Sequence, residues 1–315
     1  MSDTVLLDAG FAYPEVKVVL AAMRGRDWAA VRAVLDAAGP VGRSTLIRAA
    51  SEEYGQEEFL RHVLAEDPDD TAAAAMLGMH LIDIGWRIRS DARAQHVSGG
   101  QFEAFHDWLR RAEMVLLEGV ARGPADPALW VARLTSARGL ELGLDETRRR
   151  YRKLAAIDPH HLPGQNAYLQ RLCPKWSGDW PMLHAWCRAE MLAAPPGAVQ
   201  AVLVVDGHIE HWAELGESAN LGYLRSKPVR DEIDEAAQRS VRHPDFGRDY
   251  GWVQVASSFA MIYSVLGDRA AAGAMFDMLG DLGTEVPWCY VGDGNAAQQI
   301  RAYRQRARRR GRVVG

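Results

Sequence analysis

Apolar residues recur at intervals of three and four along almost the whole chain, and sustained alternation of apolar and polar residues is nearly absent. Such spacing places the apolar side chains on one face of a helix. Trp28, Val31 and Leu35 carry the pattern in one segment, which follows the N-cap residue Asp27 and stops at Gly39-Pro40. The pattern therefore predicts an all-α protein built from helical hairpins.

The same criteria predict most of the helices and their ends. Ser98 to Gln101 is typical of a capping box, Asp145 is expected to cap a helix, and Leu221 to Pro228 is expected to be a linker. The predicted helices cover residues 14–23, 28–38, 44–54, 56–65, 72–89, 102–120, 127–142, 146–157, 181–193, 198–215, 229–241 and 252–266, with an Arg-rich helix near the end.

A sharp joint near the middle of the chain organises this pattern. Pro174 disfavours a helical conformation for the residue before it. The residue types of Ser177-Gly178-Asp179 favour a turn, and Asp179 is suited to be the N-cap of the next helix. Trp176 and Trp180 flank the joint, where we expect them to fill the gap between helix pairs; a ligand-stacking platform is the alternative. The joint separates an N-terminal half, 1–171, from a C-terminal half, 172–315, within one continuous superhelical domain.

One passage resembles a tetratricopeptide repeat. Tyr263-Ser264-Val265-Leu266-Gly267 is followed by Asp268 and by small residues up to Phe276, which matches the helix–Gly-Asp–helix joint and the Ala-x-x-x-Phe step of that repeat. The period drifts elsewhere, so we expect an irregular tetratricopeptide-like solenoid of antiparallel helix pairs.

Four further motifs carry a wider resemblance: Gly85-Trp86-Arg87-Ile88-Arg89, Phe105-His106-Asp107-Trp108-Leu109-Arg110-Arg111, Cys173-Pro174-Lys175-Trp176-Ser177-Gly178-Asp179-Trp180 and Asp206-Gly207-His208-Ile209-Glu210-His211-Trp212. Together they are similar to a group of uncharacterised actinobacterial proteins. That group is allied to a bacterial domain of unknown function with a tetratricopeptide-like helical fold. The resemblance implies this fold and assigns no activity or site.

Composition narrows the possible partners and location. The 315 residues carry a formal net charge of -4, so no overall field favours nucleic acid or an anionic membrane. Three cysteines without a Cys-x-x-Cys pair indicate reduced thiols. No signal peptide or membrane-spanning run is evident, and we expect a cytoplasmic protein that binds neither membrane nor nucleic acid.

Two groups of residues stand out as candidate chemistry. Guanidinium groups beside tryptophans are suited to clamp a phosphate or carboxylate, although cations at a helix C-terminus also have a structural role. The predicted ligand-binding residues are Trp86, Arg87, Arg89, Trp108, Lys175 and Trp176, and His208 was a further expected lining residue.

His208 and His211 share a helix face, as metal ligands would. Neither they nor the set of His184, Cys187 and Cys173 matches a metal motif, so we predict no metal and no cofactor, and favour hydrogen bonding for the histidines.

We therefore expect a non-catalytic scaffold that binds a protein or peptide partner. The alternative is an enzyme or binder of a small anionic ligand, with a pocket lined by Arg, His and Trp. In that alternative the catalytic residues are His106, Asp206, His208 and His211. A scaffold would present its side chains along an open groove, whereas an enzyme would gather them around a closed pocket.

Overall fold

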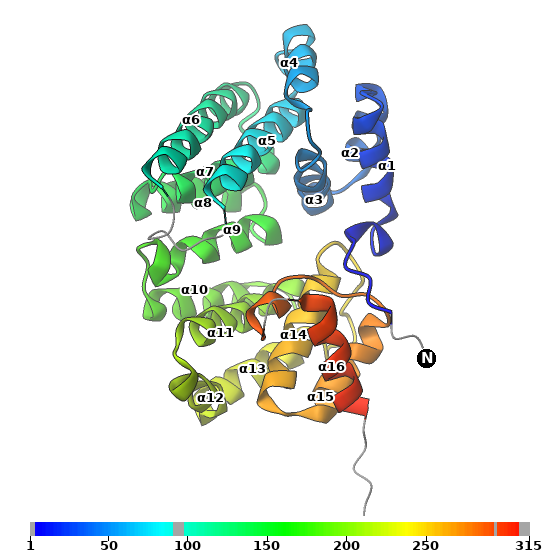
Figure 1. Cartoon of the computed structure of the whole chain (residues 1–315), viewed down its shortest axis with the longest axis vertical. Coiled ribbons are helices and arrows are strands. Elements are labelled where there is room, and N and C mark those ends of the chain that lie inside the picture. The colour runs from blue at the N-terminus through cyan, green and yellow to red at the C-terminus, as the bar shows by residue number, and fades with distance from the viewer. Residues whose placement is uncertain (1–3, 91–97, 293–294, 309–315) are drawn as a thin grey trace, which may run out of the picture. The chain divides into compact units, whose positions relative to one another are not determined.

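The computed structural model describes residues 4–90, 98–292 and 295–308, and within these ranges the protein contains sixteen α-helices and no strand (Figure 1). The all-α prediction is confirmed. Among the described residues, none of the helices combines the length and the apolar character needed to cross a membrane.

The chain divides into two compact units. The N-terminal unit consists of Pro14–Arg171 and Lys175–Ser177, and the C-terminal unit consists of Met1–Tyr13, Leu172–Pro174 and Gly178–Gly315. The first described residues thus belong to the C-terminal unit. Leu6 forms a parallel bridge with Leu282, and Arg304 donates a hydrogen bond from Nη1 to the carbonyl oxygen of Thr4 at 3.0 Å.

Nine α-helices with described bounds build the N-terminal unit: α1 Pro14–Arg24, α2 Trp28–Ala37, α3 Pro40–Ser51, α4 Glu57–Glu66, α5 Thr71–Arg89, α6 Gly99–Arg122, α7 Pro127–Gly139, α8 Leu144–Ile157 and α9 Leu162–Leu172, whose last residue joins the C-terminal unit. The capping box of Ser98 and Gln101 is confirmed at the start of α6. Two predicted helix starts are wrong. Helix α3 begins at Pro40, where a missing N–H costs nothing, and Gly143, not Asp145, is the N-cap of α8.

Helix α5 forms the centre of the N-terminal unit and is buried on nearly all sides, as expected of a core helix. Its small residues let α6 lie close alongside it (Figure 1). A Cβ atom at Gly78 would approach the Cδ2 atom of Leu116 on α6 to 2.4 Å, so a larger residue there would force the two helices apart.

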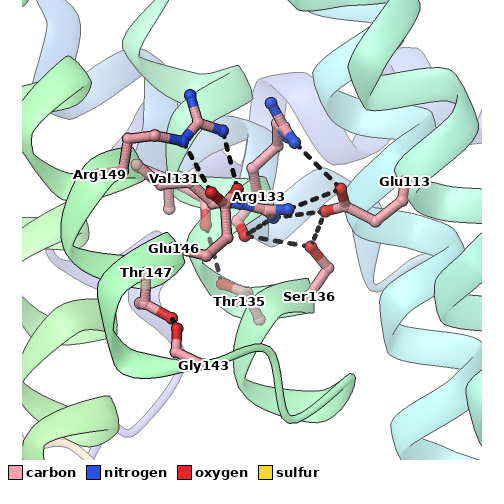
Figure 2. Close-up of polar contacts among 10 residues, drawn as sticks. Glu113, Val131, Arg133, Thr135, Ser136, Gly143, Glu146, Thr147 and Arg149 are labelled. Atoms are coloured by element: carbon pink, nitrogen blue, oxygen red, sulfur yellow. Dashed lines mark hydrogen bonds and ion pairs between the residues drawn. The ribbon is translucent and has the colours of Figure 1, made fainter.

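A buried network of ion pairs joins α6, α7 and α8 (Figure 2). Glu113 on α6 pairs with Arg133 on α7 at 3.2 Å and with Arg150 on α8 at 2.7 Å, and it also accepts a hydrogen bond from Ser136. The Arg133 and Arg150 side chains are 6% and 3% exposed, so Glu113 supplies the charge that makes their burial tolerable. Burial, and then the charge of Arg150, lowers the pKa of Arg133.

The same network extends to Glu146 in the first turn of α8 (Figure 2). Glu146 accepts hydrogen bonds from Arg149 at 2.7 and 2.8 Å and from Arg150 at 2.8 Å. The hydrogen bond from Arg149, helped by the one from Arg150, lowers the pKa of Glu146 to about 2. Glu146 thereby holds Arg150 on α8 in place, and Arg150 carries the network on to Glu113 of α6 and to the carbonyl oxygen of Arg133 on α7.

Seven α-helices build the C-terminal unit: α10 Trp180–Ala193, α11 Val202–Glu214, α12 Glu217–Arg225, α13 Lys227–Arg239, α14 Trp252–Leu266, α15 Arg269–Leu279 and α16 Ala296–Arg308. The predicted N-cap Asp179 is confirmed, since its side chain accepts from the backbone N–H of Met182 at 2.7 Å. The predicted linker over residues 221–228 is wrong. Most of it lies in α12 and in the first turn of α13, because Lys227-Pro228 suits the start of a helix.

The joint between α9 and α10 is a tight turn. The 3-10 helix η3, Pro174–Trp176, is followed by Ser177, whose φ of 71° lies in the left-handed region. A Cβ atom at Gly178 would lie 1.9 Å from the carbonyl oxygen of Leu172, which is backbone and cannot turn aside. Only glycine fits this close approach.

Candidate functional site

Trp86, near the end of α5, lies at the centre of a group of aromatic side chains in the N-terminal unit. Its ring centroid lies 4.7 Å from that of Phe105 on α6 and 5.9 Å from that of Trp176, which meets it edge-on. Gly139 on α7 makes room for this arrangement, because a Cβ atom there would lie 2.8 Å from Phe105 and 3.4 Å from Trp86.

Two arginines complete this group. The guanidinium carbon of Arg89 lies 5.3 Å from the Trp86 ring centroid, and that of Arg138 on α7 lies 5.4 Å from Trp86 and 5.6 Å from Trp176. Each such cation–π contact stabilises by about 0.5–1 kcal/mol at a partly exposed site. We call Trp86, Arg89, Phe105, Arg138 and Trp176 the tryptophan–arginine cluster.

The remaining predicted ligand-binding residues lie on the same unit but outside this cluster. Arg87 stacks 4.1 Å above the ring of Tyr54 and donates to the carbonyl oxygen of Glu52 at 2.7 Å. Trp108 is half-buried beneath Arg111 at 4.8 Å, and Lys175 is exposed. The structure thus brings together Trp86, Arg89 and Trp176 of the predicted set. Sequence reasoning missed Arg138, because nothing local to α7 indicates that it reaches Trp86.

A second group of polar side chains lies in the C-terminal unit, among α10, α11, α12 and α13. The Nδ1 atom of His208 lies 2.7 Å from the hydroxyl of Tyr223, and its Nε2 atom lies 2.9 Å from Oε2 of Glu232. The Nε2 atom of His184 lies 3.2 Å from the same hydroxyl and 3.0 Å from Nδ1 of His211. We call these five residues the histidine cluster.

The rings of the histidine cluster also stack. The His184 and His208 centroids lie 4.6 Å apart, and Trp180 stacks on His211 at 4.2 Å with 5° between the ring planes. Trp180 on α10 thus packs against His211 on α11. That it fills a gap between helix pairs stays a prediction.

Burial decides the protonation of these groups. It lowers the pKa of His184 to about 4, aided by the neighbouring charges of His208 and His211, and it lowers the pKa of His211 in the same way. Burial raises the pKa of Tyr223, and the hydrogen bond with His208 lowers the pKa of Glu232. At neutral pH His184 and His211 are therefore uncharged.

The four predicted catalytic residues do not share one set of contacts. His208 and His211 lie in the histidine cluster, and sequence reasoning missed Tyr223 because its segment was expected to be a linker. Asp206 bonds to Ser258 and Gln254 of α14 from the opposite side of α11. His106 lies in the N-terminal unit, beside Phe102 and Phe105.

Asp206 nevertheless has unusual ionisation. Burial raises its pKa to about 7, and the negative charge of Glu210, one turn along α11, adds to the increase. Glu210 itself accepts a hydrogen bond from the hydroxyl of Tyr290 at 2.9 Å. A carboxyl with such a pKa can take up and release a proton near neutral pH, which is why active sites often contain one.

Two of the three cysteines, Cys173 and Cys187, are buried in the described part of the chain. Cys187 is fully buried, packs near Gly207, and has its pKa raised by burial. Within the part of the chain that the structure describes, no group of three His, Cys, Asp or Glu side chains has the geometry to hold a metal ion.

A cavity of about 620 Å³ lies elsewhere in the N-terminal unit, where α3, α5 and α7 begin. Arg32, Arg43 and Arg122 contribute to its lining or rim, and each of them pairs with a carboxylate: Arg43 with Asp126 at 3.0 Å, for example. The N-termini of α5 and α7 are likewise capped, since Asp70 and Asp126 accept from their backbone N–H groups. These pairings balance the positive charge of the cavity.

Comparison of the chain with protein-family models, with curated proteins and with solved structures finds no match. The resemblance to the actinobacterial group stays a prediction. Any functional argument therefore depends on the two clusters themselves.

Proposed function

We propose that the chain is a non-catalytic helical scaffold that binds a protein or peptide partner through the tryptophan–arginine cluster. The observation that carries this proposal is the position of Trp86, a half-buried indole between the guanidinium groups of Arg89 and Arg138 and against the edge of Trp176. Tryptophan and arginine are the residue types that most often dominate binding energy at protein interfaces.

The packing of the cluster favours binding as well as stability. Stacking holds Arg89 and Arg138 against flat rings, so less side-chain freedom remains to be lost when a partner arrives. Lys175, next to Trp176 in the sequence, is exposed and adds positive charge. We infer that the partner presents carboxylates beside an apolar or aromatic side chain, because complementary charge guides encounter and sets specificity.

The pairing of the helices supports a tetratricopeptide-like arrangement within each unit. Successive helices pack together as α5 with α6, α7 with α8, α10 with α11 and α14 with α15. Between α14 and α15, Gly267 has a φ of 78° and Asp268 caps the next helix, the geometry that the predicted repeat joint requires. Stacked helix pairs provide extended surfaces that bind other chains.

The alternative, a small-molecule binder or enzyme, draws its support from the pKa of Asp206 and from the histidine cluster. It is weaker because the predicted catalytic residues form separate sets of contacts. A small anionic ligand could bind to Arg89 and Arg138 in place of a protein partner. The experiment below distinguishes these two kinds of ligand.

The test compares native mass spectra of tagged protein recovered from its own host with spectra of the same sample after denaturation. We expect a co-purifying polypeptide. Its affinity, remeasured with purified components by calorimetry, should fall at least tenfold in the charge-reversal variant Arg89→Glu/Lys175→Glu.

The matched control is Arg61→Glu/Arg148→Glu, which makes the same change in net charge at two partly exposed sites of the N-terminal unit outside the cluster. Its affinity should equal that of the unchanged protein. A partner that binds both variants equally well would refute the proposed site, and a retained small molecule with no polypeptide would favour the alternative.

A further inference from the structure

The hydroxyl of Tyr223 is the point where the histidine cluster meets α12. It lies within hydrogen-bond distance of His208 on α11 and of His184 on α10, and the Tyr223 ring centroid lies 4.2 Å from that of His211. Among the described side chains of α12, residues 220–225, Leu224 is the one that is fully buried. Tyr223 therefore adds a polar attachment of this nine-residue helix to the apolar one that Leu224 provides.

The distances allow one consistent placement of protons when the imidazoles are neutral. His208 donates from Nε2 to the carboxylate of Glu232, which leaves Nδ1 free to accept the hydroxyl proton of Tyr223. The N–H of His184 Nε2 then lies between the Tyr223 oxygen and Nδ1 of His211, which both accept. The four short contacts of the cluster then share three protons, because the N–H of His184 serves two of them.

A first additional proton can be accommodated. When a proton enters at Nδ1 of His184, the N–H at Nε2 of this ring still donates to the Tyr223 oxygen and to Nδ1 of His211. The hydrogen bonds of the cluster are kept, at the cost of holding the positive charge of His184 in a buried site.

A second proton, at Nδ1 of His211, opposes the contact between His184 and His211. Two N–H groups then face each other across 3.0 Å, on charged rings whose centroids lie 5.3 Å apart. Like charges at such distances repel, so the rings have to separate, and Tyr223 loses its contact with His184.

Other charged groups surround the cluster without replacing these contacts. Arg188 on α10 pairs with Glu235 on α13 at 2.7 Å, and its charge also acts on Glu232. Asp206 and Glu210 face α14 and Tyr290 from the other side of α11. Because Glu235 balances the charge of Arg188, this pair leaves the proton uptake to the histidines themselves.

We propose that the histidine cluster is a pH-sensitive latch that fastens α12 to α10 and α11 through Tyr223 and releases this helix when the cluster takes up protons. The device goes beyond the proposed binding function, because it lies in the C-terminal unit and the tryptophan–arginine cluster lies in the N-terminal unit.

The sign of the effect follows from proton linkage. His184 has its pKa lowered from 6.5 to about 4 in the closed latch, and release returns it towards 6.5. The open form therefore binds protons more readily, and opening becomes more favourable as the pH falls from about 6.5 towards 4. For His184 alone, the opening equilibrium at pH 5 is expected to increase about 30-fold relative to pH 7.5.

Hydrogen exchange measured by mass spectrometry between pH 7.5 and pH 5, corrected for the intrinsic rate, tests the latch. The amides of residues 220–225 should lose protection by about 30-fold. The amides of α15 should keep theirs. Unchanged protection in α12, or an equal loss in α15, would overturn the proposal.

The variant His184→Asn/His211→Asn should abolish this pH dependence, because amides do not titrate. His243→Asn, in the same unit and outside the cluster, should keep it. If the double variant does not fold, nuclear magnetic resonance of the unchanged protein decides: the His184 and His211 rings must titrate over the pH range in which α12 opens. Titration outside that range would equally overturn the proposal.

Discussion

The charge of Glu113 should be among the most costly to remove in the N-terminal unit. The substitution Glu113→Gln keeps the size of the side chain but leaves Arg133 and Arg150, 6% and 3% exposed, without their shared carboxylate. Arg150 retains its pair with Glu146, so Arg133 bears most of the loss. Breaking a buried ion pair from one side costs about 3–5 kcal/mol, and we expect the free energy of unfolding to fall by that amount.

A matched substitution on the same helix calibrates the measurement. Asp107 pairs with Arg110 at 2.5 Å, but these side chains are 54% and 63% exposed, so Asp107→Asn should cost less than about 1 kcal/mol. Urea unfolding followed by circular dichroism at 222 nm gives both values.

Replacing Glu113, Arg133 and Arg150 together by methionine should recover most of the loss, because no buried charge is then left unpaired. If Glu113→Gln costs no more than Asp107→Asn, the network does not act as a buried unit and the reasoning fails.

Three further predictions concern the C-terminal unit. Asp206→Asn should stabilise the protein in urea unfolding by about 1–2 kcal/mol more at pH 8 than at pH 5. The pKa of this half-buried carboxyl is raised to about 7 in the folded protein, so its ionisation destabilises the fold increasingly as the pH rises from about 4 to 7. An equal effect of the substitution at both pH values would contradict this. Gly178→Ala should lower the melting temperature sharply by its clash with Leu172, whereas Gly273→Ala, with open space in α15, should raise it slightly; the reverse order would be decisive against the argument. The thiol of Cys187 should react with an aromatic disulfide reagent at pH 8 only after unfolding, and rapid reaction in the native protein would show that burial does not control it.

Local chemistry made much of the fold predictable. The caps Ser98 and Asp179 and the glycine joint at Gly267 were each identified from residues within a few positions, because capping and left-handed turns depend on near neighbours. The helix over residues 217–225 was missed because it is short, contains Gly222 and lies between Gly216 and Pro228, signals that also suit a linker.

The candidate sites were less predictable because they depend on contacts between distant segments. His208 and His211 stood out by their helical spacing, but nothing near them in the sequence indicates Tyr223 or Glu232, which come from two later helices. In the same way Arg138 reaches Trp86 from another helix. The spacing of residues in the sequence identifies which face of a helix carries polar or ionisable side chains. The tertiary packing determines which residues of other helices contact that face.

The assignment of residues 4–13 to the C-terminal unit has a consequence for how the protein is made. The carbonyl oxygen of Thr4 receives its hydrogen bond from Arg304, and Leu6 pairs with Leu282, so residues 4–13 leave the ribosome well before the segments that they bind. The Pro14–Arg171 helices can pack during synthesis, whereas these contacts of the C-terminal unit form only after Leu282 and Arg304 have been made. Until then, chaperones and proteases have access to an incomplete C-terminal unit.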